Sequence, residues 1–143
     1  MSRGDTNALQ ELVVDAGPLI ELLCGTPLGL KFEEKVVEED NLLYVSETTV
    51  SEVYYVLCRQ LGRNEAARKT EILLESVEVV EGEAVQMLAG DYKCKRAISL
   101  SDCFTIAAAK ITGVPAMFRK EKELLEEIEK EKFDVEIIFV EDL

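Results

Sequence analysis

The chain has 143 residues, of which 48% are hydrophobic and 31% are charged, so it can bury the core of one ordinary domain. Histidine is absent and the four cysteines form no C-x-x-C pair, which excludes histidine-based catalysis, histidine-based zinc sites and a recognisable disulfide framework. The net charge of −13 argues against nucleic-acid binding, because phosphate contacts depend on Lys and Arg.

We expect a single domain over residues 1–143, with residues 1–10 flexible or peripheral. The N-terminus is short and polar, and the sequence has no apolar run of about 18 residues, the length that a membrane-spanning helix needs. These features predict a cytoplasmic protein that makes no contact with a membrane.

Short apolar runs alternate with amphipathic segments along the chain. Leu12–Val14 is predicted as a buried strand that ends at Asp15, and a helix with Pro18 in its first turn follows and ends near Cys24. The later predicted elements are, in chain order, a helix over 28–39, a strand over 41–45, helices over 47–62 and 64–76, a strand over 77–80, helices over 82–95 and 98–113, a strand over 114–118, a helix over 121–132 and a strand over 135–140. Gly62 and Gly113 are expected to end helices, and Asn64 is expected to cap one.

This alternation predicts a three-layer α/β/α fold, in which helices cover both faces of a central parallel sheet of about five short strands. Ligands of such sheets bind at the carboxyl ends of the strands. Asp15 directly follows the first predicted strand and therefore lies at that edge.

Two other acids lie near the starts of predicted helices. Asp102 shares one helical stripe with the apolar residue Ile106, so an ionised carboxylate on this packed side needs a positive partner. Glu52 lies on the less buried side of the 47–62 helix. The alanines after Asp102 allow that helix to approach the sheet closely.

Each acid also has a purely structural interpretation. Asp15 is a suitable N-cap for the helix that follows it. Asp102 fits a capping box that begins at Ser99, and Glu52 fits a weaker one that begins at Thr49 or is simply solvated. Both interpretations stay open for each acid at the level of sequence.

If the carboxylates converge, a divalent cation would relieve their repulsion. Oxygen-only ligands suit Mg²⁺ or Mn²⁺, and a carboxylate-held ion can activate water and stabilise a phosphodiester transition state. The pattern thus favours metal-dependent hydrolysis.

Three segments resemble the PIN-domain ribonucleases, of the kind found as VapC-type toxins in toxin–antitoxin pairs. They read VVDAGPLIELL, VSETTVSEVYYVL and ISLSDCFTIAAAKITGVPAMF, and they cover nearly the whole chain in the family's order. The resemblance implies a metal-dependent endoribonuclease in which Asp15, Glu52 and Asp102 hold the metal. Ser101 would support the site by orienting Asp102 or a water.

The fourth acidic motif of the family departs from its usual T-x-D form. Phe118 stands at the usual Thr, and the expected Asp falls near Lys120. A shift of one residue makes Glu121 the fourth catalytic acid, and Glu123 is the next candidate. The same resemblance implies an RNA substrate, an antitoxin partner and a homodimer.

Other functional classes remain as alternatives. A catalytically weak or silent PIN-like module that binds a partner protein is favoured by the altered fourth motif and by the negative charge. A receiver-type signalling domain would need an adjacent acidic pair after the first strand, and a haloacid-type phosphatase would need D-x-D there, but the sequence reads DAG.

Overall fold

The computed structural model describes residues 11–143, so the expectation for residues 1–10 lies outside the described residues. Its centre is a five-stranded sheet of order β3-β2-β1-β4-β5, in which every neighbouring pair is parallel. The strands are β1 (Glu11–Val14), β2 (Leu42–Ser46), β3 (Glu78–Val80), β4 (Ala116–Phe118) and β5 (Ile137–Phe139). The predicted α/β fold with a parallel central sheet is therefore confirmed.

Helices connect consecutive strands, as parallel pairing requires. They are α1 (Ala16–Cys24), α2 (Pro27–Phe32), the π-helix η2 (Glu33–Val37), α3 (Glu47–Leu61), α4 (Arg63–Ser76), α5 (Glu83–Lys95), α6 (Leu100–Thr112), α7 (Lys122–Lys130) and the 3₁₀ helix η3 (Val140–Asp142). None of the described helices is both long and apolar enough to cross a membrane.

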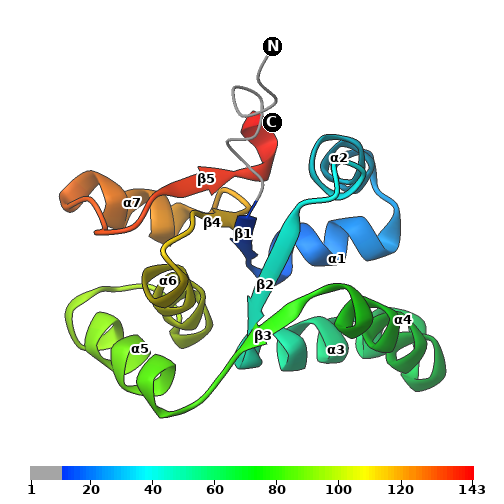
Figure 1. The fold of residues 1–143 in the computed structure, drawn as a ribbon, viewed down its shortest axis with the longest axis horizontal. Coiled ribbons are helices and arrows are strands. Elements are labelled where there is room, and N and C mark those ends of the chain that lie inside the picture. Colours follow the sequence, from blue (N-terminus) through cyan, green and yellow to red (C-terminus); the bar gives the residue numbers. More distant parts are fainter. Residues whose placement is uncertain (1–10) are drawn as a thin grey trace.

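Two apolar cores cover the two faces of the sheet, because successive strand residues point to opposite sides. Leu12 and Val14 belong to the core that α1, α3 and α4 share, whereas Val13 belongs to the core formed with α5, α6 and α7. Figure 1 shows α1–α4 on one side of the strands and α5–α7 on the other. β1 is buried on both faces, which explains its uninterrupted apolar sequence.

The order of the strands creates a switch point between β1 and β4. The chain leaves β1 towards β2 and β3, and it leaves β4 in the opposite direction towards β5. In open parallel sheets a crevice forms where neighbouring strands diverge in this way, at their carboxyl ends. The topology therefore places a crevice next to Asp15.

The predicted helix over 28–39 is wrong as a single α-helix. α2 starts one residue earlier because Thr26 accepts a hydrogen bond from the Gly29 N–H and Pro27 occupies the first position. After Phe32 the backbone changes to the wider π pattern, with the Glu38 N–H bonded to the Glu33 carbonyl at 2.9 Å. Apolar periodicity does not distinguish these two forms.

The predicted cap of the fourth helix is also wrong. α4 begins at Arg63, and its N-cap is Gly62 rather than Asn64. Gly62 has φ of +89°, a conformation that L side chains rarely adopt, and it both ends α3 and precedes α4. Gly62 alone therefore forms the turn between α3 and α4, and no side chain caps the start of α4.

Helix α6 packs closely on the sheet through its alanines. Ala107 and Ala108 are fully buried, and α6 contacts β1, β2 and β4.

We predict that Ala107→Leu lowers the free energy of unfolding by about 1–3 kcal/mol, because a larger side chain would push α6 away from the strands. Urea unfolding measures this change. Ala84→Leu at an exposed position of α5 is the matched control, and equal losses in both variants would contradict the predicted close packing.

Candidate active site

Asp15 and Glu121 follow the two central strands on either side of the switch point. Asp15 comes directly after β1, and its N–H donates to the Met117 carbonyl of β4 at 2.9 Å, which holds the ends of the two strands together. Glu121 follows β4 as the residue before α7. The sheet therefore brings residues 106 positions apart in sequence to the same edge.

Asp102 reaches this edge from the first turn of α6. Ser99 is the N-cap, and its hydroxyl accepts a hydrogen bond from the Asp102 N–H at 3.1 Å. Only half of the capping box forms, since the described hydrogen bonds include none from the Ser99 N–H to the Asp102 carboxylate. Asp102 is instead 8% exposed and lines the cavity at this edge of the sheet.

The three carboxylates converge. One oxygen each of Asp15, Asp102 and Glu121 lies within 4.8 Å of the other two. They line a cavity of about 500 Å³, together with Glu52, Ser99, Arg119 and Lys120. The ends of β1 and β4 and the start of α6 therefore form a cavity lined by carboxylate oxygens.

The structural interpretation of Asp15 does not hold. Asp15 occupies the N-cap position of α1, but its side chain makes no capping hydrogen bond. Its Oδ1 accepts from the Thr105 hydroxyl at 2.7 Å instead, and the residue is 5% exposed. Tertiary contacts, rather than a capping role in α1, therefore set the position of the Asp15 carboxylate.

Glu52 lines the same cavity but is not one of the group of three. It is half-buried, and its Oε1 accepts a hydrogen bond from the Ser101 hydroxyl at 2.6 Å. Among the described hydrogen bonds the Ser101 side chain donates to Glu52 and not to Asp102. The capping alternative for Glu52 is wrong, because α3 begins at Glu47 with Ser46 as its cap.

Glu123 belongs to a neighbouring cavity of about 440 Å³, which Asp102 and Glu121 also line. Lys93 of α5 also lines this cavity. The two cavities therefore share Ser99, Asp102 and Glu121, and Glu123 contributes negative charge next to the converging carboxylates.

Burial and mutual repulsion make these acids hard to ionise. Burial raises the pKa of Asp15 well above its usual value, and the Asp102 charge raises it further. Burial and the Glu121 charge raise the pKa of Asp102 to about 7. The pKa of Glu121 is also raised, by partial desolvation and by the Glu52 charge.

Thr105 is a contact that the sequence analysis missed. Its hydroxyl is fully buried on α6, three residues after Asp102. A buried polar residue in an otherwise alanine-rich stretch was the available signal, since buried hydroxyls need partners. Its bond to Asp15 opposes the rise in the pKa of Asp15.

A PIN domain family model matches residues 12–131, which is most of the chain. The chain belongs to the PIN-domain family. The match spans β1 to the end of α7 and includes all the acids described above. A search of curated proteins finds no match.

Solved structures share the PIN fold at low sequence identity. VapBC2 from Rickettsia felis, bound to a promoter DNA fragment, aligns with a TM-score of 0.69 and 11% identity over 90% of this chain and 98% of that chain. VapC20 from Mycobacterium tuberculosis, a toxin that cleaves the sarcin–ricin loop, gives 0.63 and 19% over 73% and 86%. PAE2754 from Pyrobaculum aerophilum gives 0.61 and 23% over 94% and 93%.

The raised pKa of Asp102 predicts a dependence of stability on pH in the metal-free protein. Its ordinary value is 3.8 and its folded value is about 7, so the folded state binds the proton more tightly than the unfolded state. This contribution to stability is complete below about pH 4 and is lost as the pH rises through about 7. We predict that Asp102→Asn is more stable than the unaltered chain by about 2 kcal/mol at pH 8, with a smaller difference at pH 4.

Urea unfolding at both pH values, in the presence of a chelator, measures this difference. The matched control is Asp91→Asn at an exposed position of α5. A difference for Asp102→Asn that is the same at both pH values would contradict the assigned rise in its pKa.

Proposed function

We propose that this PIN domain is a Mg²⁺- or Mn²⁺-dependent endoribonuclease, and that it is the toxin of a toxin–antitoxin pair. The observation that carries the proposal is the convergence of the Asp15, Asp102 and Glu121 carboxylates at the switch point of a PIN fold. VapC20, which shares this fold, is described as a toxin that cleaves the sarcin–ricin loop.

The donor set fits a hard divalent cation. All three groups offer oxygen, and in the described part of the chain no Lys or Arg nitrogen forms an ion pair with any of them. Mg²⁺ and Mn²⁺ prefer such ligands, and either ion would relieve both the repulsion and the desolvation. A bound cation would supply an activated water and charge stabilisation at the phosphorus.

Each acid at the site has its own role in the proposed reaction. Asp15, Asp102 and Glu121 would hold the cation, and Glu121 supplies the acid that the family's T-x-D position lacks here. Glu52, which lines the cavity and accepts a hydrogen bond from Ser101, would complete the site or hold the attacking water. Glu123 would add to the field that concentrates cations in the neighbouring cavity.

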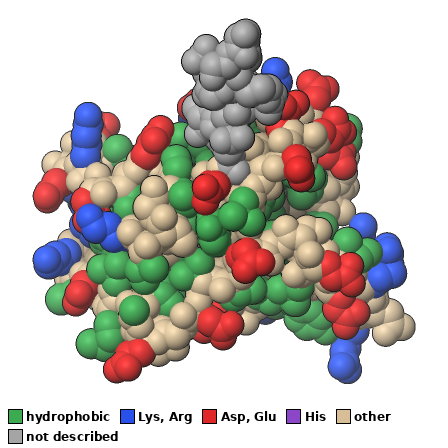
Figure 2. Space-filling model, viewed as in Figure 1, with side chains coloured by type: hydrophobic (Ala, Val, Ile, Leu, Met, Phe, Trp, Pro, Cys, Tyr) green, Lys and Arg blue, Asp and Glu red, His purple; other side chains and the backbone are tan. Residues whose placement is uncertain are grey.

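The surface charge limits how RNA can bind. In Figure 2, acidic side chains are spread over the visible face and basic side chains gather at its margins. Arg119 lines the site, but its guanidinium pairs with Glu21 at 2.7 Å and Glu141 at 3.5 Å. Lys120 pairs with Asp142 at 2.9 Å. Most of the positive charge at this rim is therefore already balanced.

Lys93 is the exception near the site. Its Nζ donates to the Ile98 carbonyl at 2.7 Å, and among the described residues no carboxylate lies within ion-pair distance of it. It faces the cavity that holds Asp102 and Glu121. We assign to Lys93 the contact with a phosphate adjacent to the scissile bond.

The proposed partners are a basic antitoxin and a second copy of the chain. Several structures with this fold are toxin–antitoxin complexes, including VapBC from Salmonella typhimurium bound to DNA, at 12% identity. The net charge of −13 complements a basic antitoxin segment, and a toxin of this kind would act in the cytoplasm. Light scattering of the chain without a partner would measure whether it forms a homodimer.

The alternative function is a silent PIN module that binds a protein partner. Two observations favour it: Glu52 lies outside the converging group, and Lys120 falls where the family has an acid. Calorimetry with Mn²⁺ separates the two functions, since the enzyme requires binding at millimolar concentration or tighter and the silent module does not.

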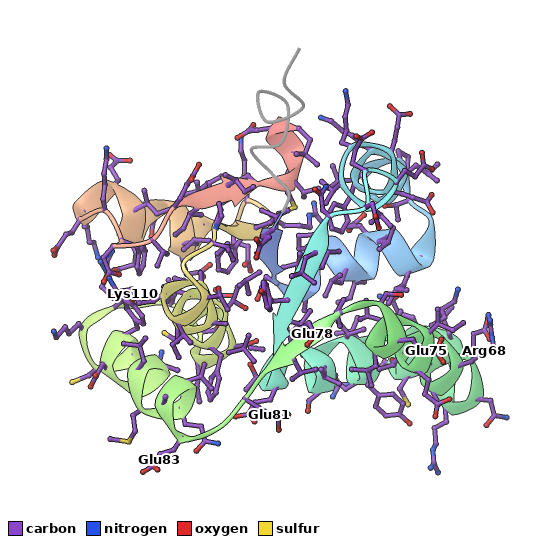
Figure 3. All side chains as sticks on the ribbon, viewed as in Figure 1. Arg68, Glu75, Glu78, Glu81, Glu83 and Lys110 are labelled. Atoms are coloured by element: carbon purple, nitrogen blue, oxygen red, sulfur yellow. The ribbon has the colours of Figure 1, made fainter. Side chains whose placement is uncertain are left out.

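We predict that Asp15→Asn lowers the rate of Mn²⁺-dependent RNA cleavage by on the order of 10²-fold, because a neutral amide cannot balance the cation. Glu83→Gln is the control, since it removes the same charge at the outer end of α5 (Figure 3). Cleavage of a labelled single-stranded RNA measures both rates, and equal activity in Asp15→Asn and the unaltered chain would exclude the nuclease.

We predict that Lys93→Gln raises KM for RNA several-fold and leaves kcat within about twofold, because it removes one phosphate contact away from the reacting atoms. The slope of log affinity against log salt should also become shallower by about 0.7, the value for one contact to a single strand. Lys35→Gln, at an exposed position of η2, is the matched control. An unchanged salt slope in Lys93→Gln would refute the assigned contact.

A further inference from the structure

A chain of buried hydroxyl groups leads from the second strand to Asp15. The Ser46 hydroxyl, at the end of β2, lies 2.9 Å from the Thr48 hydroxyl and 3.0 Å from the Thr49 hydroxyl, both in the first turn of α3. Thr49 Oγ1 lies 3.5 Å from Thr105 Oγ1 on α6. Thr105 then donates to Asp15 Oδ1 at 2.7 Å. Four elements thus meet through side-chain oxygens.

The chain is enclosed by the fold. Ser46, Thr49 and Thr105 are each 0% exposed, and Thr48 at the outer end is half-buried. Buried hydroxyls without partners would each destabilise the protein, so three of them in contact at the junction of β1, β2 and α6 form a connected polar network in an apolar core.

Each hydroxyl carries one proton, so the direction of every bond is fixed once Asp15 is ionised, the state in which it would hold a cation. Because the Thr105 proton is used on Asp15, Thr49 must donate to Thr105. The Thr49 proton is then used, so Ser46 donates to Thr49, and Thr48 donates to Ser46 by the same argument. Ser46 also accepts from the Thr49 N–H at 3.1 Å.

We propose that Thr48, Ser46, Thr49 and Thr105 form a one-way relay of hydrogen-bond donors that fixes Oδ1 of Asp15 and leaves its other oxygen for a divalent cation. Thr105 is the positioning residue, and the other hydroxyls set the direction in which it donates. This rests on the proposed function only in that the cation is the one described above.

The relay has two consequences at the site. The described hydrogen bonds to the Asp15 side chain use only Oδ1, and Asp15 lines the cavity, so its second oxygen accepts none of them and can serve the cation. The relay also ties β1 to α3 and α6, which carry Glu52 and Asp102. A donor aimed at a carboxylate before the cation arrives reduces the reorganisation that binding requires.

The first test compares Thr105→Val with Thr105→Ser by Mn²⁺ calorimetry. Valine keeps the shape but removes the hydroxyl, so we expect about tenfold weaker Mn²⁺ binding, whereas serine keeps the donor and should bind within about twofold of the unaltered chain. Thr70→Val is the matched control, because Thr70 is buried on α4 and its hydroxyl has no hydrogen-bond partner among the described residues.

The second test requires no metal. The Thr105 hydroxyl proton should exchange slowly enough to be seen by NMR in the metal-free protein, with a cross-peak to Thr105 side-chain protons. Thr49→Val should shift this resonance and weaken Mn²⁺ binding by a smaller factor than Thr105→Val, because the 3.5 Å contact between Thr49 and Thr105 is the longest link.

The outcomes distinguish the relay from the proposed function. Loss of Mn²⁺ affinity in Thr105→Val, with recovery in Thr105→Ser and no change in Thr70→Val, supports the relay. Equal affinity in Thr105→Val and the unaltered chain overturns the relay and leaves the nuclease intact. No Mn²⁺ binding by the unaltered chain overturns the metal site, and with it the part of the relay that concerns the cation.

Discussion

The structure depends on the enforced proximity of three carboxylates. Like charges within 4.8 Å of one another, two of them more than nine-tenths buried, oppose folding unless they are protonated or a cation lies between them. No short-range rule of sequence produces this arrangement. It arises because β1 and β4 are neighbours whose chains leave in opposite directions, and because α6 begins at the same edge.

The rest of the fold supplies the rigidity that this arrangement needs. β1 is buried on both faces, and α6 lies against three strands through fully buried alanines, so Asp15 and Asp102 cannot move apart without opening a core. The hydroxyl contacts through Thr105 add a directional constraint on Asp15. The electrostatic repulsion at the site lowers the stability of the fold, and the apolar packing around the site offsets it.

Much of the fold could be predicted from the sequence, because apolar periodicity and the alternation of strands and helices are local signals. The sheet, the placement of Asp15 after β1 and the inward position of Asp102 all follow from them. The π turn after Phe32 and the glycine at the start of α4 could not be predicted in this way. They depend on backbone hydrogen bonding and on φ values that side-chain patterns do not encode.

The candidate site was predictable in its members but not in its exact grouping. The family motif pointed to Asp15, Glu52 and Asp102, whereas the closest group contains Glu121 in place of Glu52. The grouping depends on tertiary contacts, such as the hydrogen bond from the Ser101 hydroxyl to Glu52. Thr105 was missed because its partner lies 90 residues away in the chain.

We propose that a divalent cation binds between these carboxylates. A crystal of the protein soaked in Mn²⁺, with data collected at the manganese absorption edge, would locate the ion. We expect an anomalous peak with oxygens of Asp15, Asp102 and Glu121 at about 2.1–2.3 Å from the ion, slightly longer than for Mg²⁺. A peak elsewhere, or none at millimolar Mn²⁺ near neutral pH, would contradict it.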